Sequence, residues 1–384
     1  MKPRAGGPSR CCSATSPLGE NFNGLLFFAT IARSQTPLPA ALPNVLPAAD
    51  SKVLYVGRVD HDAPGGPRAQ WPGTEIRLRF RGTAIQITLT DTGLNRYTLI
   101  IDDREPTMVG SSDSRCTVDL AKDLPPGDHR VSLFRSSGAG GGIVQFHTFA
   151  TDGQWLQPRP RKRRIEIIGD SISAGTGDEG TAGSDLINMH NTNAFLAYGC
   201  VAARRLGADY TCLAIRNRRM AKYGFIDHRP HKVPGDTLPE MYDRALPSDP
   251  ASRWSFPADA APDAVVINLS TNDFFTTGFD EREFVQTYEH FLNRIRRHYP
   301  AAAIYLTDSP LLDDAGDNNR HDLSKLRGLL DHIAHDSADP RVHIFLFDRI
   351  EKSDGKGAGW HPSVATHAKM AEKLVETLKH DLGW

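Results

Sequence analysis

The chain has 384 residues, enough for two domains of ordinary size, and its 39% hydrophobic residues can supply a core for each. Lys and Arg (45) nearly balance Asp and Glu (46), so the chain lacks the positive field that attracts nucleic acid or an anionic membrane surface. Its five cysteines are too few and too irregularly spaced for a disulfide scaffold or a zinc site. We therefore expect a globular monomer without a nucleic-acid partner.

Residues 1–47 have the composition of a tail, rich in Pro, Gly, Ser and Ala. Their one apolar run, "GLLFFATIA", is too short to span a bilayer, and no membrane span is expected. Basic residues precede this run and a proline-rich polar stretch follows it, as in a secretory signal. Two interpretations stay open: a signal that directs the protein out of the cell or into the periplasm, or a disordered tail.

Residues 48–157 show apolar residues that alternate with a period of two, which is typical of half-buried strands. The segments "EIRLRF" (75–80) and "AIQITLT" (84–90) flank Arg81, Gly82 and Thr83, and this spacing predicts a hairpin. The pattern continues in "RYTLIID", "HRVSLFR" and "GIVQFHTF". Short strands without a helical pattern predict an antiparallel β-sandwich of the jelly-roll type.

The third region, residues 158–384, opens with the basic stretch "RPRKRR" (159–164), which we interpret as a solvated linker rather than a nucleic-acid patch. Four short apolar runs follow, separated by segments of helical length: "RIEIIGD", "DAVVINLS", "AAIYLTDS" and "VHIFLFD". Such runs predict the fold class α/β, a parallel sheet covered by helices. Functional residues of these sheets lie in loops at the carboxyl ends of the strands.

The first of these strands ends in "IIGDSISAGTG" (167–177). Gly169 allows a sharp turn, Asp170 can bond amides of that turn, and Ser171 would then point away from the sheet edge. Ser171 is therefore a candidate nucleophile, although an Asp-Ser pair after a strand is also an ordinary helix cap. The block is not a Gly-x-Ser-x-Gly elbow, because position 173 is Ser.

Two later segments carry a possible donor and a possible base. In "NLSTNDFF", the Asn272 amide can donate to an oxygen that becomes negative during acyl transfer, although the same residues also suit a turn. In "GAGWHPS", His361 stands before Pro362, which suits the first turn of a helix. We expect His367, inside that helix, to pack or hydrogen-bond. The predicted apolar face of the helix consists of Val364, Ala368, Ala371, Leu374, Val375 and Leu378.

Ser171, Asn272 and His361 stand in the chain order of an SGNH (GDSL-type) hydrolase. With the preceding sandwich, the chain resembles carbohydrate esterase family 2, whose members carry a jelly roll before an SGNH domain and remove acetyl groups from plant polysaccharides. The resemblance runs from about Val53 to the C-terminus. Its motifs are "VGRV", "WPGTEIRLRFRGT", "YTLIIDD", "IIGDSISAGTG", "INLSTNDF" and "GWHPSVATHAKMAEKL".

The resemblance implies a serine esterase that removes O-acetyl groups from xylan- or mannan-type carbohydrate through an acetyl-serine intermediate, without a cofactor. Ser171 would attack, His361 would take its proton, and the amide of Ser171 with the side chain of Asn272 would bind the oxyanion. Trp360 would offer an apolar face to the acetyl group or the sugar, or else pack under its loop. Two alternatives are a catalytically impaired carbohydrate-binding protein and an SGNH esterase or acyltransferase with a non-carbohydrate acyl substrate.

The chain departs from the family pattern at two blocks. Ser270 replaces a usual glycine, which a serine can do if its φ is negative. The block usually written Ser-Gly-x-Gly reads "RNRR" (216–219), with Arg219 where a glycine amide completes the oxyanion hole. Either the amide of Arg219 still points inward or the pocket is altered, because arginine resists backbone conformations that glycine adopts.

The acid of the triad is missing from its usual places before His361, which are occupied by Ala358 and Gly359. Asp354 could fold back toward the ring, or a main-chain carbonyl could accept the Nδ1 proton instead. We expect a Ser-His dyad. No metal site is expected, because the histidines lack an HExxH motif, and we interpret His228–His231 in "DHRPH" as part of a surface loop.

Overall fold

The computed structural model describes residues 41–226, 229–232, 235–275, 279–315 and 321–384. The chain divides into two units, Met1–Leu38 and Pro39–Trp384, and the fold below is that of the second unit. The predicted signal or tail therefore lies almost entirely outside the described residues. Within the described part of the chain, no helix combines the length and apolar character that crossing a bilayer requires.

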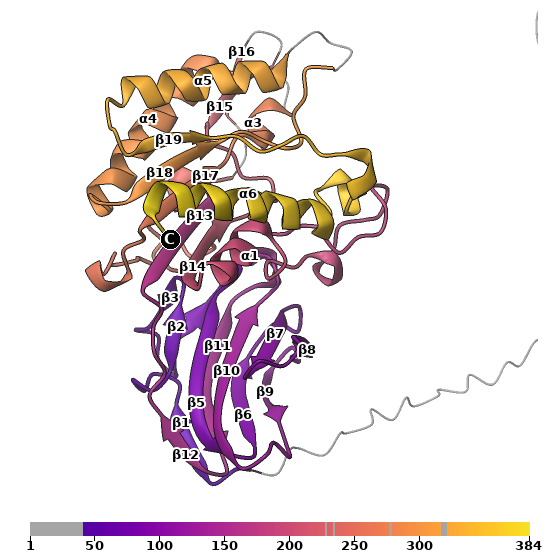
Figure 1. Ribbon diagram of the computed structural model, residues 1–384, viewed down its shortest axis with the longest axis vertical. Helices are drawn as coiled ribbons and strands as arrows, with labels where there is room; N and C mark the ends of the chain where they lie inside the picture. The colour runs from indigo at the N-terminus through magenta and orange to yellow at the C-terminus, as the bar shows by residue number, and fades with distance from the viewer. Residues whose placement is uncertain (1–40, 227–228, 233–234, 276–278, 316–320) are drawn as a thin grey trace, which may run out of the picture. The chain divides into compact units, whose positions relative to one another are not determined.

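Two six-stranded antiparallel sheets form the N-terminal sandwich (Figure 1) and confirm the predicted class. One sheet contains β1 (Asn44–Pro47), β3 (Val59–Asp60), β4 (Arg68–Ala69), β6 (Ile85–Thr90), β9 (Arg115–Ala121) and β11 (Val144–Thr151). The other contains β2 (Leu54–Val56), β5 (Glu75–Gly82), β7 (Arg96–Ile101), β8 (Thr107–Gly110), β10 (Gly127–Arg135) and β12 (Gln154–Leu156). Alternate residues of both sheets, such as Phe80, Ile87 and Val131, fill the core between them.

The first strand of the sandwich begins earlier than the sequence pattern predicts. We assigned residues 1–47 to a tail, but Asn44–Pro47 form β1 and pair antiparallel with β11. The short segment shows little alternation because only Leu46 is buried. Its register with a neighbouring strand, rather than its own composition, makes it part of the sheet.

The predicted hairpin between residues 75–80 and 84–90 is wrong. β5 pairs with β10, whereas β6 pairs with β9 and β11 in the opposite sheet. The turn is held by Asp152, whose Oδ1 accepts hydrogen bonds from the amides of Thr83 (2.8 Å) and Ala84 (3.1 Å). The chain therefore crosses from one sheet to the other at this turn.

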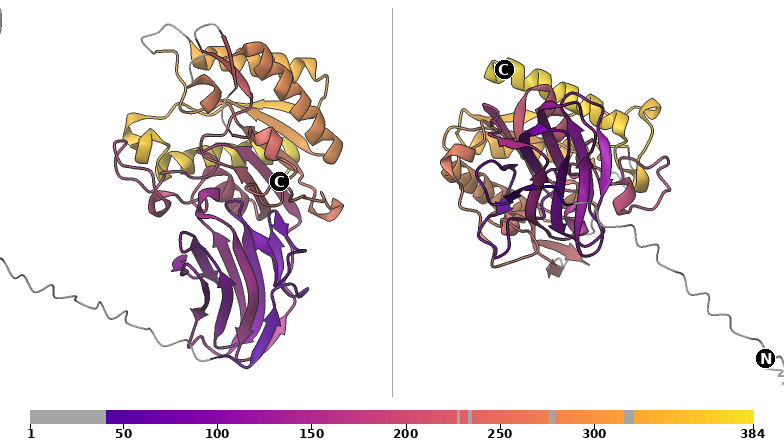
Figure 2. Two further views of the ribbon diagram at one scale, coloured as in Figure 1. Left: turned by 180° about the vertical axis from the view of Figure 1, so that it is seen from behind. Right: turned by 90° about the horizontal axis from the view of Figure 1, so that it is seen from below.

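A five-stranded parallel sheet in the order β14-β13-β17-β18-β19 forms the second half of the unit. Its strands are β13 (Arg163–Gly169), β14 (Ala208–Ala214), β17 (Ala264–Asn268), β18 (Ala303–Thr307) and β19 (Val342–Phe345). Helices α4 (Glu281–His298) and α5 (Asp322–Asp336) cover one face, and α1 (Tyr198–Arg205) and α6 (Val364–Leu382) cover the other (Figures 1 and 2). This is the predicted α/β/α arrangement.

Shorter elements complete this half. They are the helices α2 (Leu238–Met241) and α3 (Thr271–Phe274), the paired strands β15 (Tyr223–Ile226) and β16 (Arg229–Lys232), and the 3-10 helices η1 (Ala139–Gly141, within the sandwich), η2 (Met189–Asn191), η3 (Ala258–Ala260), η4 (Lys352–Asp354) and η5 (Ala358–Trp360). α3 contains Asn272, and η5 directly precedes His361.

Helix α6 begins three residues after His361, and four of the six residues of its predicted apolar face are buried, namely Ala371, Leu374, Val375 and Leu378. Ser363 caps the helix by accepting a hydrogen bond from the amide of Thr366. Val364, predicted to be apolar core, is 37% exposed, whereas His367 and Met370 are buried. The buried face therefore also includes His367, whose Nδ1 accepts a hydrogen bond from the amide of Tyr198 on α1 (3.2 Å).

The sandwich is joined to the parallel sheet by buried ion pairs. Arg58 lies 3.3 Å from Glu166 on β13, and both side chains are almost fully buried. Arg77 on β5 lies 2.5 Å from Asp209 on β14. These pairs attach the sandwich to the two strands that lead to Ser171 and to the "RNRR" block.

Candidate active site

The strand β13 ends in a tight turn that presents Ser171. A Cβ on Gly169 would lie 2.1 Å from Ser173 Oγ, so a side chain at this position would clash. The fully buried Asp170 stabilises the turn, since its Oδ1 accepts from the amide of Ile172 (2.9 Å). Ser171 is 5% exposed and stands at the carboxyl end of the sheet, where strands of this fold position functional groups.

His361 contacts Ser171 directly, with 2.8 Å between His361 Nε2 and Ser171 Oγ. On its other side, Nδ1 lies 3.2 Å from the carbonyl oxygen of Ala358 and 3.1 Å from that of Gly359. A carbonyl oxygen can only accept, so these contacts assign the ring proton to Nδ1. Nε2 is then free to accept the hydroxyl proton of Ser171.

The ring of His361 is held in its neutral form. Burial lowers its pKa below the usual 6.5, the two carbonyls act in the opposite direction, and the positive charge of Arg216 lowers it further. Arg216 is exposed and follows β14 by two residues, just as Ser171 follows the neighbouring β13 by two. A neutral imidazole is the form that can act as a base near pH 7.

Main-chain hydrogen bonds fix the loop that carries His361. Gly359 and Trp360 adopt positive φ angles of 60° and 65°, which turns the chain sharply before the base. Its amides bond to the segment 177–185: Ala358 N to Gly177 O (2.7 Å), Gly359 N to Asp185 O (3.0 Å) and Trp360 N to Gly183 O (3.2 Å). His361 is thus attached to the stretch that follows Ser171.

The carboxylate of Asp354, our alternative orienting group, is directed elsewhere. Its Oδ1 lies 2.6 Å from Lys369 Nζ on α6, and its Oδ2 accepts from the amide of Glu351 (3.2 Å). The bond from Lys369 lowers the pKa of Asp354. This geometry favours the carbonyls of Ala358 and Gly359, rather than Asp354, as the groups that orient the ring.

In the "RNRR" block, the residue with a left-handed backbone conformation is not the arginine that we singled out. Asn217, not Arg219, adopts the left-handed conformation, with φ of 64°. Asparagine enters this region more readily than other non-glycine residues. The Arg219 side chain is buried, with Nε 3.8 Å from Asp273 Oδ1. Arg219 therefore packs against a carboxylate, and its backbone carries no left-handed strain.

Asp273 is a residue that sequence reasoning passed over. Its carboxylate accepts from the amides of Met220 (2.9 Å) and Ala221 (2.8 Å), which fixes the end of the "RNRR" block. Burial raises the pKa of Asp273 to about 6 and that of Asp170 to about 7. The Asn-Asp pair after β17 is the sequence signal that could have indicated Asp273. The amides that Asp273 binds, however, lie about 50 residues earlier in the chain.

Asn272 lies beside the nucleophile turn and already has two acceptors. Its Nδ2 donates to the carbonyl of Arg218 (2.9 Å) and, over a longer distance, to Asp170 Oδ2 (3.3 Å). Ser270, the residue before α3, has a φ of −170°, which any residue adopts. The expected tolerance of serine at this position is consistent with this angle.

Comparisons with known proteins agree with both halves of the fold. The model of the carbohydrate esterase 2 N-terminal domain matches residues 55–160, and that of the GDSL-like lipase/acylhydrolase family matches residues 167–369. A solved family two carbohydrate esterase from Clostridium thermocellum, in complex with cellohexaose, is 34% identical, with a TM-score of 0.79, over 86% of this chain and 99% of that one. The chain belongs to carbohydrate esterase family 2.

Two curated relatives extend this comparison. The cellulase/esterase CelE of Acetivibrio thermocellus is 33% identical over 338 residues, which are 86% of this chain and 40% of CelE. The chain thus spans well under half the length of that relative. An acetylxylan esterase/glucomannan deacetylase of Cellvibrio japonicus is 24% identical over 345 residues, 89% of this chain and 92% of the relative. Family 2 consists of carboxylic ester hydrolases.

In this family 2 chain, Trp360 does not pack under its loop. Its side chain is 64% exposed. A Cβ on Gly183 would lie 2.6 Å from the indole ring, so the ring rests against the backbone of Gly183. Most of the ring is therefore open to solvent, on the residue directly before His361.

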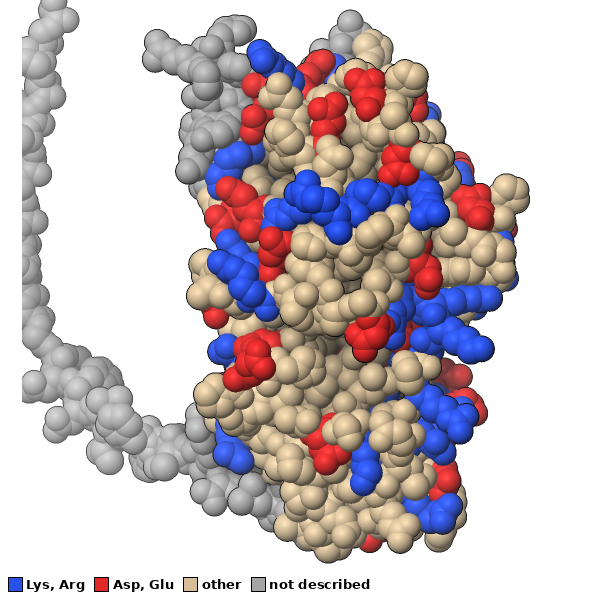
Figure 3. All heavy atoms as spheres, turned by 90° about the vertical axis from the view of Figure 1, so that its left-hand side faces the viewer, with Lys and Arg blue, Asp and Glu red and all other residues tan. Residues whose placement is uncertain are grey.

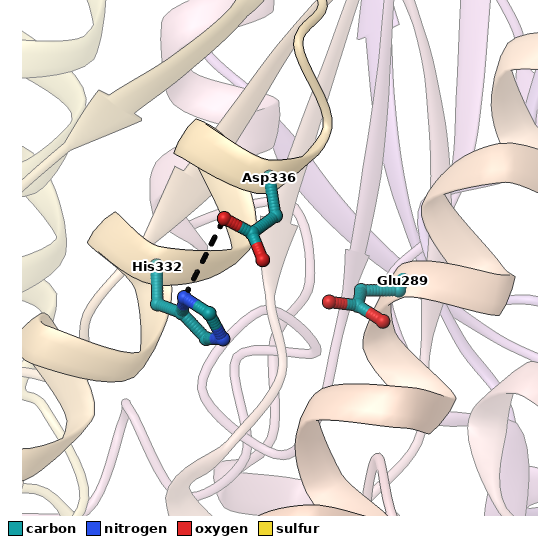
Figure 4. A group of neighbouring side chains, drawn as sticks. All are labelled: Glu289, His332 and Asp336. Carbon is teal, nitrogen blue, oxygen red and sulfur yellow. Dashed lines mark ion pairs between the residues drawn. The ribbon is translucent and has the colours of Figure 1, made fainter.

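A group of potential metal ligands lies on α4 and α5, apart from the elements that carry Ser171 and His361. Glu289 on α4 faces His332 and Asp336 on α5, and their ligand atoms lie within 4.8 Å of one another (Figure 4). His332 Nδ1 is 3.6 Å from Asp336 Oδ1, one helical turn away, and both are exposed. The sequence search for paired histidines had missed this combination. His228 and the side chain of His231, also considered there, lie outside the described residues.

Proposed function

We propose that the chain is a serine esterase that removes O-acetyl groups from xylan- or mannan-type polysaccharide through an acetyl-serine intermediate. The observation that carries the proposal is the contact of 2.8 Å between His361 Nε2 and Ser171 Oγ, in a ring whose Nδ1 faces carbonyl oxygens. Nucleophile, base and orienting acceptor are the parts that acyl transfer needs. We propose further that the protein acts outside the cytoplasm, since its substrate is a polymer.

The proposed reaction has two halves. Ser171 Oγ attacks the acetyl carbonyl while its proton moves to His361 Nε2, giving a tetrahedral oxyanion. The oxyanion collapses, the bond to the sugar oxygen breaks, and this oxygen takes the proton from Nε2. Water then attacks the acetyl-serine, again with His361 as base, and releases acetate and free Ser171.

The oxyanion would be met by donors at the ends of β13, β14 and β17. The amide of Ser171 and Nδ2 of Asn272 are the first two, and the backbone amide of Arg219 is a third candidate. The long contact between Asn272 and Asp170 (3.3 Å) is the one that an oxyanion would replace. Losing one such donor typically costs about 3 kcal/mol of transition-state stabilisation.

The choice of an acetylated polysaccharide rests on the relatives and on Trp360. One relative, from Cellvibrio japonicus, is named an acetylxylan esterase/glucomannan deacetylase. Another, from Clostridium thermocellum, was solved in complex with cellohexaose. The exposed indole beside His361 offers an apolar face of the kind on which sugar rings stack. We propose that Trp360 positions the sugar that carries the acetyl group.

Release of acetate from acetylated xylan, acetylated glucomannan and an aryl acetate tests the proposal. We expect turnover by the wild type and a loss of at least about a thousandfold in Ser171→Ala, as when a catalytic serine is removed. Ser173→Ala, two residues along the same turn, is the matched control and should retain most activity. Equal turnover by Ser171→Ala and wild type would overturn the mechanism.

The same assays separate the other two interpretations. Sugar binding without turnover, even on the activated aryl acetate, would indicate a carbohydrate-binding protein that has lost catalysis. Turnover of aryl esters with no release of acetate from any glycan would indicate a non-carbohydrate acyl substrate.

A further inference from the structure

A groove of about 580 Å³ lies where the sandwich meets the parallel-sheet half, away from Ser171 and His361. Its walls come from β5, β7 and β10, from the linker before β13, and from α1. The arginines among its lining residues are Arg77, Arg79, Arg130, Arg159, Arg161 and Arg204. The acidic residues that line it are Asp102 and Asp103. The "RPRKRR" stretch, interpreted above as a plain linker, thus contributes to a basic groove.

The floor of the groove places like charges opposite each other. Arg79 on β5 and Arg130 on β10 are direct cross-strand partners, and Arg77 faces the groove two residues along β5. Like charges directly opposite in a sheet are destabilising. Asp103 pairs with Arg130 at 3.0 Å, and Arg79 has a longer ion pair with Asp128 at 4.0 Å. Arg77 is paired with Glu75 and Asp209, so the cost of the cross-strand contact falls on Arg79 and Arg130.

Main-chain carbonyls hold several of these guanidinium groups without neutralising them. Arg79 donates to Gln157 O (3.3 Å), Arg161 to Ala208 O (3.1 Å) and Arg204 to Phe195 O (2.7 Å). The carboxylate nearest to Arg161, Glu75 at 3.7 Å, already binds Arg77 at 2.6 Å. Burial and the charge of Arg77 lower the pKa of Arg161, so an anion in the groove would be favourable. The cationic groups are oriented in advance.

We propose that this groove is a non-catalytic binding site for an acidic oligosaccharide, whose carboxylates pair with Arg79, Arg159 and Arg161. Planar guanidinium groups bind carboxylates in a bidentate manner, and the groove has the volume of a small-molecule site. The anionic ligand follows from the groove, while the choice of a glycan rests on the proposed function. The face in Figure 3 carries basic and acidic side chains side by side, in keeping with a net charge of −1, which disfavours nucleic acid.

Calorimetry with the full chain carrying Ser171→Ala tests the site without turnover. The probes are an oligogalacturonate and a neutral xylo-oligosaccharide of equal length, each at low and raised salt. We expect the acidic probe to bind at the groove and to weaken as salt rises, because the contacts are ionic. No binding of the acidic probe, or equal binding of the neutral one, would overturn the proposal. So would tighter binding of a single-stranded oligonucleotide.

Matched variants locate the site. Arg79→Gln and Arg159→Gln should each weaken binding of the acidic probe by about tenfold, as expected for a lost charged hydrogen bond. Arg282→Gln, an exposed residue on α4 that removes the same charge, should not change it. With Ser171 restored, Arg79→Gln should turn over an aryl acetate like the wild type. If Arg79→Gln loses binding of the acidic probe but keeps full esterase activity, the groove is the binding site and is separate from catalysis. If the wild-type chain binds the probe but shows no esterase activity, only the proposed function is contradicted. Equal weakening in all three variants would overturn the site.

Discussion

The ring of His361 depends on two carbonyl oxygens where many serine hydrolases use a carboxylate. Carbonyls fix the tautomer and the orientation, as the contacts of 3.2 and 3.1 Å show. They bring no negative charge to stabilise the imidazolium that forms during the reaction. The dyad would therefore operate with a weaker base than a full triad, in a ring kept neutral by burial.

Replacing Asp354 separates the two possible orienting groups. Because its carboxylate binds Lys369 at 2.6 Å and the ring contacts carbonyls, Asp354→Ala should leave kcat/KM nearly unchanged. Lys369→Ala is the matched control, since it breaks the same ion pair from the other side. A loss of about a hundredfold or more in Asp354→Ala alone would instead indicate a triad.

The pH profile of kcat/KM should report His361. Activity requires the neutral ring, so kcat/KM should fall as the pH drops through a pKa that lies below 6.5. Arg216→Gln removes a positive charge that lowers this pKa, and the acidic limb should move to higher pH. The shift should shrink at high salt, and Arg282→Gln should not produce it. A profile that Arg216→Gln leaves unmoved at low salt would contradict the placement of Arg216 near the base.

At the level of single residues, the motifs predict which side chains meet but not how they are held. Ser171, Asn272 and His361 were identifiable because each follows a recognisable strand or precedes a helix. The partnership of Asp273 with the amides of Met220 and Ala221 was not, because it joins two loops that only the folded sheet brings together. The same holds for Asn217, whose conformation depends on the path of its loop.

At the level of elements, apolar runs predict the parallel sheet well because β13, β17 and β18 are buried along most of their length, although the edge strand β19 is only partly buried. The sandwich is harder, because the two sheets share one alternating pattern. Residues 81–83 suit a hairpin turn and a crossing between sheets equally well. Asp152, whose carboxylate holds this turn, lies about 70 residues further along the chain. A similar limit applies to Val364, because the contacts of α6 with its neighbours, and not its own sequence, decide that Val364 is exposed while His367 is buried.

Helix α6 carries a buried histidine that should make stability depend on pH. Burial lowers the pKa of His367 to about 3, whereas the unfolded chain titrates near 6.5. Below pH 6.5 the unfolded state binds a proton that the folded state does not. The free energy of unfolding should therefore fall with falling pH between 6.5 and 3, by up to ~1.4 kcal/mol per pH unit.

His367→Asn tests this dependence. The amide oxygen of the introduced side chain can still accept a hydrogen bond from the amide of Tyr198, but the side chain cannot titrate. Denaturant unfolding at several pH values should give a shallower slope for the variant than for the wild type. Parallel slopes would show that His367 does not contribute. His380→Asn, at an exposed position of the same helix, is the control.

At the level of the whole molecule, the ion pair of Arg58 and Glu166 holds the sandwich to β13. Arg58 is fully buried, and it also lies over the rings of Tyr242 (4.6 Å) and Phe256 (4.9 Å). Glu166→Ala would leave the buried positive charge of Arg58 without a carboxylate partner. This variant should lower the free energy of unfolding by about 3–5 kcal/mol. Asp128→Ala, which breaks the exposed pair with Arg81, should cost less than about 1 kcal/mol. Equal midpoints of denaturant unfolding in the two variants would contradict this role.

The loop before His361 is tied to residues 177–185 by backbone amides and carbonyls, and every residue except proline has both groups. A substitution in this loop can change a side chain without removing the acceptors of the Nδ1 proton. A carboxylate side chain, by contrast, can be lost as an acceptor by a single substitution. Gly359 is the exception within the loop, because its φ of 60° and a Cβ that would lie 2.5 Å from Ile187 Cδ1 require glycine there.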